Sequence, residues 1–121
     1  MAMSKRGIFE NPTKSPWNFE VYDSDLERRM MEHLEHDPSV AKWTKRHGVS
    51  IPWMDSQKRQ RRYVPDFLVE YTDGRIALIE VKDPSRLDTD DVKRKRSAAE
   101  LWCRQRGIEY IVMTISTGRR A

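Results

Sequence analysis

The sequence has little of three features that would place it among secreted or membrane proteins. Cys103 is the single cysteine in 121 residues, so an internal disulfide is excluded and a reducing compartment fits. No apolar run approaches the roughly 20 residues that a membrane-spanning helix needs. The N-terminal stretch also lacks the apolar core of a secretory signal. We therefore expect a soluble, cytoplasmic protein, and a single main domain, since this length leaves no room for a second core.

Charged residues, in contrast, are abundant and unevenly distributed. There are 23 Lys and Arg against 19 Asp and Glu, a net charge of +4, which favours a polyanionic partner. Two clusters are strongly basic, "QKRQRR" at 57–62 and "KRKR" at 93–96. Runs of charge are usually solvated faces, but these two bracket the candidate site described below, so contact with nucleic-acid phosphates is the better interpretation. The candidate contacts are Lys58, Arg59, Arg61, Arg62, Lys93, Arg94, Lys95 and Arg96.

The first part of the chain predicts an arm followed by a helix. Residues 1–22 contain Pro12 and Pro16 among other turn-forming residues, which indicates an extended arm before a domain over 23–121. In the helix that follows, Ser24 can serve as the N-cap, and Glu27, three residues later, completes a capping box.

The rest of the chain predicts three strands, a helix and a last strand, which gives the order α-β-β-β-α-β. Gly107 is placed to end the second helix in a left-handed conformation. A helix between the third and fourth strands permits a right-handed crossover, which makes those two strands parallel. The predicted strands cover 49–54, 63–71, 76–82 and 108–116, and the helix covers 90–106.

Three charged residues interrupt the apolar pattern of the strands over 63–71 and 76–82, namely Asp66, Glu80 and Lys82. A two-residue Asp-Gly loop between these strands would place the two acids on opposite faces of the sheet. A three-residue loop, with Gly74 in the left-handed conformation of a bulge, places Asp66 directly opposite Glu80. We favour the second register because it also makes the other face unbroken and apolar. That face consists of Phe67, Val69, Ala77, Ile79 and Val81.

The favoured register predicts a site for a divalent cation. Two carboxylates about 5 Å apart repel each other unless a cation or a proton lies between them. Magnesium suits one or two carboxylates with water and phosphate oxygens in the remaining positions. Lys82 would then lie near the attacking water or the phosphate. The alternative is a structural ion pair between Lys82 and one of the acids, which is common for an isolated E-x-K pattern. Asp66 in register on the partner strand and the nearby basic clusters favour the metal site.

The stretch "VPDFLVEYTDGRIALIEVK" resembles the PD-(D/E)XK nuclease superfamily, whose motif matches Pro65-Asp66 and Glu80-Val81-Lys82. With the preceding "SDLERRMMEHLEHDPSVAKW" and "RRYVPDFLV", the chain looks most like the N-terminal domain of the TnsA transposon endonuclease and its stand-alone relatives, many of them in phages and mobile elements. The resemblance covers about residues 24–115. It implies an α/β, restriction-endonuclease-like α-β-β-β-α-β core, in which a mixed central sheet is flanked by helices.

The resemblance also implies a function, a metal-dependent DNA endonuclease that uses magnesium, with manganese as a substitute. Asp66, Glu80 and the carbonyl of Val81 would bind the metal, Lys82 would assist the attacking water, and Glu27 would complete the site, although the capping box explains Glu27 equally well. Relatives often carry Gln in place of Glu80. Two alternatives remain open: a resolvase of Holliday junctions or other branched DNA, and a catalytically silent nucleic-acid-binding or phage assembly protein. Whether the chain forms a homodimer or binds a protein partner is also open.

Overall fold

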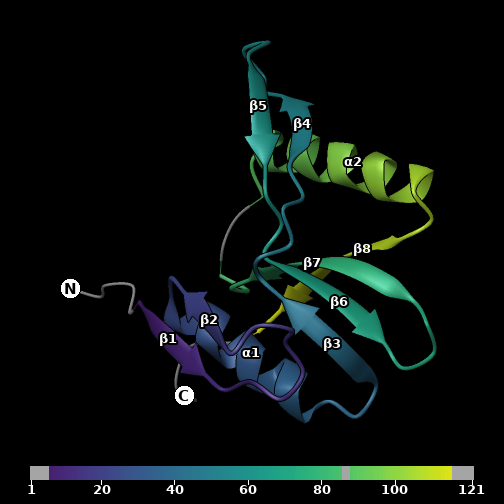
Figure 1. Cartoon of the computed structure of the whole chain (residues 1–121). Helices are drawn as coiled ribbons and strands as arrows, with labels where there is room; N and C mark the ends of the chain where they lie inside the picture. Colours follow the sequence, from purple (N-terminus) through teal and green to yellow (C-terminus); the bar gives the residue numbers. More distant parts are fainter. Residues whose placement is uncertain (1–5, 86–87, 116–121) are drawn as a thin grey trace.

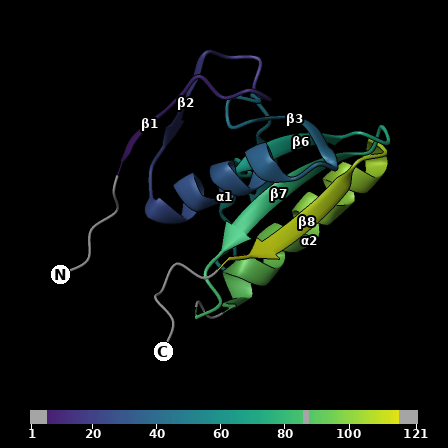
Figure 2. The same cartoon turned by 90° about the horizontal axis from the view of Figure 1, so that it is seen from below.

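A four-stranded mixed sheet forms the centre of the molecule, and one helix covers each of its faces (Figures 1 and 2). The computed structural model describes residues 6–85 and 88–115. The sheet has the order β3-β6-β7-β8, with β7 and β8 parallel and the other neighbours antiparallel. Its strands are β3 (Val40–Thr44), β6 (Phe67–Tyr71), β7 (Ile76–Lys82) and β8 (Glu109–Thr114), and the helices are α1 (Asp25–His36) and α2 (Asp90–Gln105). This confirms the predicted α/β architecture with a mixed sheet.

Helix α1 begins at the predicted cap. The hydroxyl of Ser24 accepts a hydrogen bond from the N–H of Glu27 (3.2 Å), and the Glu27 carboxylate accepts one from the N–H of Asp23 (2.7 Å). The two bonds satisfy backbone donors that the first turn of a helix leaves unpaired. The helix then buries Met30 and Leu34 against the sheet.

The apolar face predicted from the register is the face that α1 covers. Phe67, Val69, Ala77 and Ile79 are fully buried there and Val81 nearly so. At about 25 cal/mol per Å² of apolar surface, burial of such side chains is the main source of stability for the sheet. The sheet is therefore anchored at the strands that carry the candidate site.

Helix α2 covers the opposite face and makes the crossover from β7 to β8. Ala99 and Cys103 of this helix are buried with Leu78 of β7. The helix ends as predicted, because Gly107 has a φ of 71° and the N–H of Ile108 donates to the carbonyl of Cys103 (3.0 Å). The chain then enters β8, which runs parallel to β7.

The first strand of the sheet differs from the prediction. It is β3, which was not predicted. The predicted strand over 49–54 contains β4 (Ile51–Met54), but β4 pairs with β5 (Gln60–Tyr63) in a separate hairpin and does not join the central sheet. The register of β3 shifts between Val40 and Lys42, so its buried residues do not alternate and its sequence lacks the period of a strand. The predicted strand over 63–71 is likewise divided between β5 and β6. Figure 1 shows the β4–β5 hairpin extending past α2.

The predicted extended arm is also wrong for residues 7–22, which form a hairpin of β1 (Gly7–Glu10) and β2 (Phe19–Tyr22). The prolines that indicated an arm lie in its loop. Its buried Glu20 accepts hydrogen bonds from the hydroxyl of Thr44 (2.7 Å) and the N–H of Lys45 (3.1 Å), which fix the hairpin to the end of β3. Residues 1–5 of the arm and Ser116 of the last predicted strand lie outside the described residues. Neither α1 nor α2, the helices of the described residues, has the length and apolar composition of a membrane-spanning segment.

Candidate active site

The pairing of β6 with β7 follows the favoured register. Phe67 lies opposite Ile79, and the same register carries Asp66 opposite Glu80. At the turn, Gly74 has a φ of 93° and its N–H donates to the carbonyl three residues earlier (2.9 Å). The glycine is required here because other residues rarely adopt this conformation. The three-residue loop is thus confirmed, and the two acids lie at the same end of the strand pair.

Asp66 ends the pairing of β6 through its side chain. It follows the buried Pro65, and its carboxylate accepts a hydrogen bond from the N–H of Val81 (2.8 Å), where a backbone carbonyl would otherwise be the acceptor. Burial raises the pKa of Asp66 to about 6; the bond from Val81 opposes this rise, while the charges of Glu27 and Glu80 add to it. The carboxylate of Asp66 therefore lies within the electrostatic reach of both other acids.

Two tyrosines hold Glu80. The hydroxyl groups of Tyr63 and Tyr110 donate to the same oxygen of Glu80, at 2.5 and 2.9 Å. The pKa of each tyrosine is raised, chiefly by burial. Both hydroxyls therefore stay protonated and can donate. The other oxygen of Glu80 lies 4.0 Å from the guanidinium of Arg96. The geometry fixes one carboxylate oxygen and leaves the second directed toward the basic side of the site.

The sequence did not predict a role for these tyrosines because they lie far from Glu80 along the chain and meet it only in the folded protein. Tyr63 ends β5 of the separate hairpin, and Tyr110 lies in β8 opposite Leu78, on the same face as Glu80. The only signal in the sequence is a hydroxyl-bearing side chain within apolar strands, which gives no partner.

Glu27 is held by the start of α1 and by a lysine that sequence reasoning missed. Besides the N–H of Asp23, its carboxylate binds the ammonium of Lys45 at 2.7 Å. Burial acts to lower the pKa of Lys45. The hydrogen bonds and charges of the Glu27 and Asp23 carboxylates outweigh this effect, so the pKa of Lys45 is raised. The capping role of Glu27 is confirmed, and the same carboxylate lies close enough to Asp66 to raise its pKa.

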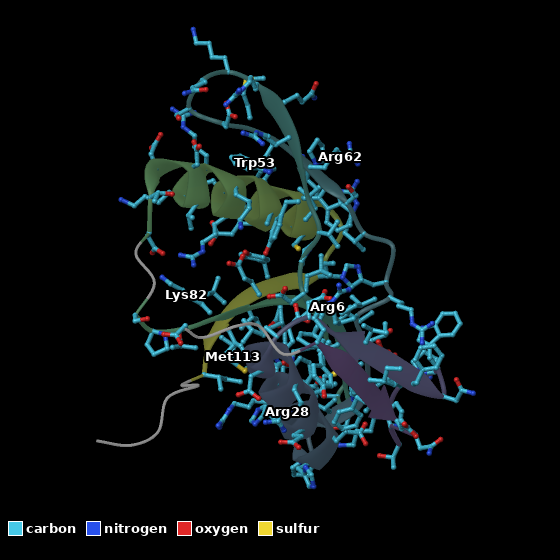
Figure 3. All side chains as sticks on the ribbon, turned by 90° about the vertical axis from the view of Figure 1, so that its left-hand side faces the viewer. Arg6, Arg28, Trp53, Arg62, Lys82 and Met113 are labelled. Atoms are coloured by element: carbon cyan, nitrogen blue, oxygen red, sulfur yellow. The ribbon has the colours of Figure 1, made fainter. Side chains whose placement is uncertain are left out.

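Lys82 lies at the end of β7, between the two helices (Figure 3). Its ammonium is 2.5 Å from one carboxylate oxygen of Asp88, and the other oxygen of Asp88 is 2.9 Å from the guanidinium of Arg96. A pocket of about 90 Å³ opens here. Its lining consists of Leu26, Glu80, Val81, Lys82, Asp83, Asp88, Val92, Lys95 and Arg96.

The residues at this end of the sheet fit a magnesium ion through two carboxylates. Asp66, Glu80 and the backbone of Val81 offer oxygen atoms only, which are the ligands that magnesium prefers. In the part of the chain that the structure describes, no three His, Cys, Asp or Glu side chains form a group that could hold a metal. Glu27, the third acid, is held by Lys45 instead. A magnesium ion held here would have two protein carboxylates as ligands, with water and phosphate oxygens in its remaining positions.

A family model described as TnsA-like endonuclease N terminal matches residues 37–115. The chain belongs to this family. The match includes Asp66, Glu80 and Lys82 together with both tyrosines, but it begins after α1, so Glu27 lies outside it. Among curated proteins, none matches the chain. Membership in a family of TnsA-like endonucleases indicates a nuclease.

One of the two basic clusters of this TnsA-like domain lies on the β4–β5 hairpin. Lys58, Arg59, Arg61 and Arg62 are exposed on its turn and on β5. Figure 3 shows Arg62 away from Lys82. Asp55, whose side chain is 1% exposed, shapes the turn by accepting the N–H of Arg59 and pairing with the guanidinium of Arg61 (2.9 Å). Hydrogen bonds from these groups lower the pKa of Asp55 to about 2. The hairpin thus carries its positive charge away from the candidate site.

The second cluster divides along α2 of the TnsA-like domain. Lys93 and Arg94 are exposed, whereas Lys95 and Arg96 are partly buried and turn toward Glu80, at 3.9 and 4.0 Å. Helical spacing explains this division, because adjacent pairs of residues face different sides of a helix. Of the eight predicted phosphate contacts, these two lie closest to the candidate acids.

Proposed function

We propose that this TnsA-like domain is a magnesium-dependent DNA endonuclease that hydrolyses phosphodiester bonds. The observation that supports it most is the pairing of Asp66 with Glu80 at one end of β6 and β7, with Lys82 one pleat beyond. Burial and the neighbouring acids raise the pKa of Asp66 to about 6. A carboxylate in such surroundings gains more from a divalent cation than an exposed one does.

In this proposal Asp66 and Glu80 bind magnesium, the carbonyl of Val81 is a further ligand, and manganese can replace magnesium. A bound divalent ion lowers the pKa of a coordinated water and neutralises charge on the phosphate. Tyr63 and Tyr110 keep one oxygen of Glu80 fixed, so the other oxygen is available to the ion. Glu27 contributes through its charge near Asp66.

Lys82 is proposed to assist the attacking water. An ammonium has three donors, one of which binds Asp88 in the free protein. A remaining donor can hold the water in line with the phosphate, and the positive charge offsets the negative charge that develops during attack. The basic side chains of α2 and of the β4–β5 hairpin supply the contacts to the DNA backbone.

Nicking of supercoiled plasmid tests the proposal. Because a single site cuts one strand, native protein should convert the plasmid to open circles when magnesium or manganese is present. A chelator should prevent the conversion. Asp66→Asn and Lys82→Ala should each lose at least about a hundredfold in rate, consistent with removal of groups that stabilise a transition state.

Matched controls exist for both substitutions. Asp73→Asn removes an exposed acid at the opposite end of β7, and Lys42→Ala removes an exposed lysine of β3. Both controls should cut normally. Absence of nicking with either metal, or equal nicking by the site variants and the controls, would refute hydrolysis at this site. A four-way junction included as substrate separates a junction resolvase from a general nuclease.

A further inference from the structure

Asp88 connects two cations that face the candidate site. It precedes α2, and its two carboxylate oxygens bind different partners: Lys82 Nζ at 2.5 Å and a terminal nitrogen of Arg96 at 2.9 Å. Neither contact comes from helical or strand spacing. The carboxylate is therefore held by the cations and not by the secondary structure around it.

Lys82 and Arg96 have more hydrogen-bond donors than the carboxylate of Asp88 can accept. The side chains of Lys82 and Arg96 are each only 18% exposed, and both line the pocket that also contains Glu80. The Nε–H of Arg96 is buried, and no described residue accepts a hydrogen bond from it. Arginine and lysine in such a pocket favour an anion with several acceptor oxygens, and a phosphate provides them in the geometry that a guanidinium binds well.

We propose that Lys82 and Arg96 form the binding site for a DNA phosphate beside the catalytic acids, and that Asp88 occupies this site in the free protein. The proposal rests on the proposed function, because it assigns the DNA phosphate nearest to Glu80. Asp88 acts as an internal competitor: DNA binds the pocket only when its phosphate replaces the carboxylate on both cations.

The local structure allows Asp88 to leave. The residue that caps α2 is Thr89, whose hydroxyl accepts the N–H of Val92 (3.1 Å), so movement of the Asp88 side chain leaves the cap intact. The side chain of Asp88 is 36% exposed, and ion pairs at such positions contribute little net stability. Replacement by a phosphate is therefore an exchange of similar contacts.

Binding of a fluorescent 20-base-pair duplex, measured by anisotropy in a chelating buffer, tests the proposal without any nuclease activity. Asp88→Asn should bind about fivefold more tightly than native protein, because the competing charge is removed. Asp73→Asn is the matched control, since Asp73 also pairs with an arginine (Arg75, 2.8 Å) but lies at the other end of β7. The control should bind within twofold of native protein. Asp88→Ala, with folding checked by circular dichroism, should behave as Asp88→Asn.

The same measurement in an Arg96→Gln background tests whether Asp88 acts through the proposed site. There the gain from Asp88→Asn should fall below about twofold. An equal gain for Asp88→Asn and Asp73→Asn, an undiminished gain in the Arg96→Gln background, or no DNA binding by any variant would overturn the proposal. Tighter binding by Asp88→Asn together with failure of the nicking assay would leave the phosphate site standing and refute hydrolysis alone.

Discussion

Replacing Asp66 by asparagine should stabilise the folded protein at neutral pH while it abolishes activity. The neutral amide keeps an oxygen that can accept the N–H of Val81, as the carboxylate does now. It removes the charge that burial and the acids Glu27 and Glu80 disfavour. A functional group whose charge destabilises the fold is a common compromise between stability and activity.

The magnitude follows from the pKa. A rise from 3.8 to about 6 in the folded state corresponds to about 3 kcal/mol. Because Asp66 is only half-buried and water screens its charge, we expect a gain of about 1–2 kcal/mol for Asp66→Asn.

Because the pKa of Asp66 is raised in the folded state, the free energy of unfolding has a characteristic pH dependence. The folded protein binds the proton of Asp66 more tightly than the unfolded chain, so ionisation lowers the free energy of unfolding as pH rises from about 4 to about 6. This loss of unfolding free energy is complete above about pH 6 and absent when Asp66 is protonated in both the folded and the unfolded state. The stability difference between Asp66→Asn and native protein should therefore be largest at pH 7.5 and vanish below about pH 3.

Urea unfolding followed by tryptophan fluorescence measures this difference, with Trp43 as a fully buried reporter. Asp73→Asn, which removes an exposed and paired acid, is the control and should not gain stability at pH 7.5. A loss of stability in Asp66→Asn at pH 7.5, or a difference that does not change with pH, would refute the reasoning that Asp66 is ionised against its surroundings.

Three further predictions concern the support of the site, the core and the basic hairpin. Tyr110→Phe should weaken manganese binding up to about tenfold in calorimetry without a change in circular dichroism, because Glu80 loses one of the hydroxyls that orient it; unchanged affinity would contradict this. Phe67→Ala should lower the free energy of unfolding by about 3–5 kcal/mol in urea, since the side chain is fully buried between α1 and the sheet; a loss under 1 kcal/mol would be incompatible with that packing. Lys58→Gln on the hairpin turn should reduce the slope of log affinity for DNA against log salt by about one, and an unchanged slope would remove the hairpin from the DNA contact.

The sequence predicted the central hairpin of the site because its signals are local. The Asp-Gly turn, the alternation of apolar residues and the register constraint act between neighbouring residues, so they placed Asp66 opposite Glu80 and marked the apolar face. The capping signals at Ser24 and Gly107 are local in the same way. The family match over residues 37–115 agrees with the resemblance that these segments carry.

The surroundings of the site could not be predicted because they depend on contacts between distant segments. Tyr63 and Tyr110 meet Glu80 only after the β4–β5 hairpin and β8 have packed around α2 and β7. Lys45 follows β3, whose bulge hides its strand pattern, and Asp88 meets Lys82 only when the start of α2 lies beside the end of β7. The prolines of the N-terminal segment marked a loop correctly, but they gave no sign of the two strands that flank it.

Direct titration of manganese tests the central claim, that Asp66 and Glu80 together bind a divalent ion. Calorimetry of native protein should show saturable binding that Asp66→Asn and Glu80→Ala each abolish. Glu100→Gln, which changes an exposed acid of α2, should bind as native protein does. Equal binding by all four proteins, or no saturable binding by the native chain, would contradict the claim.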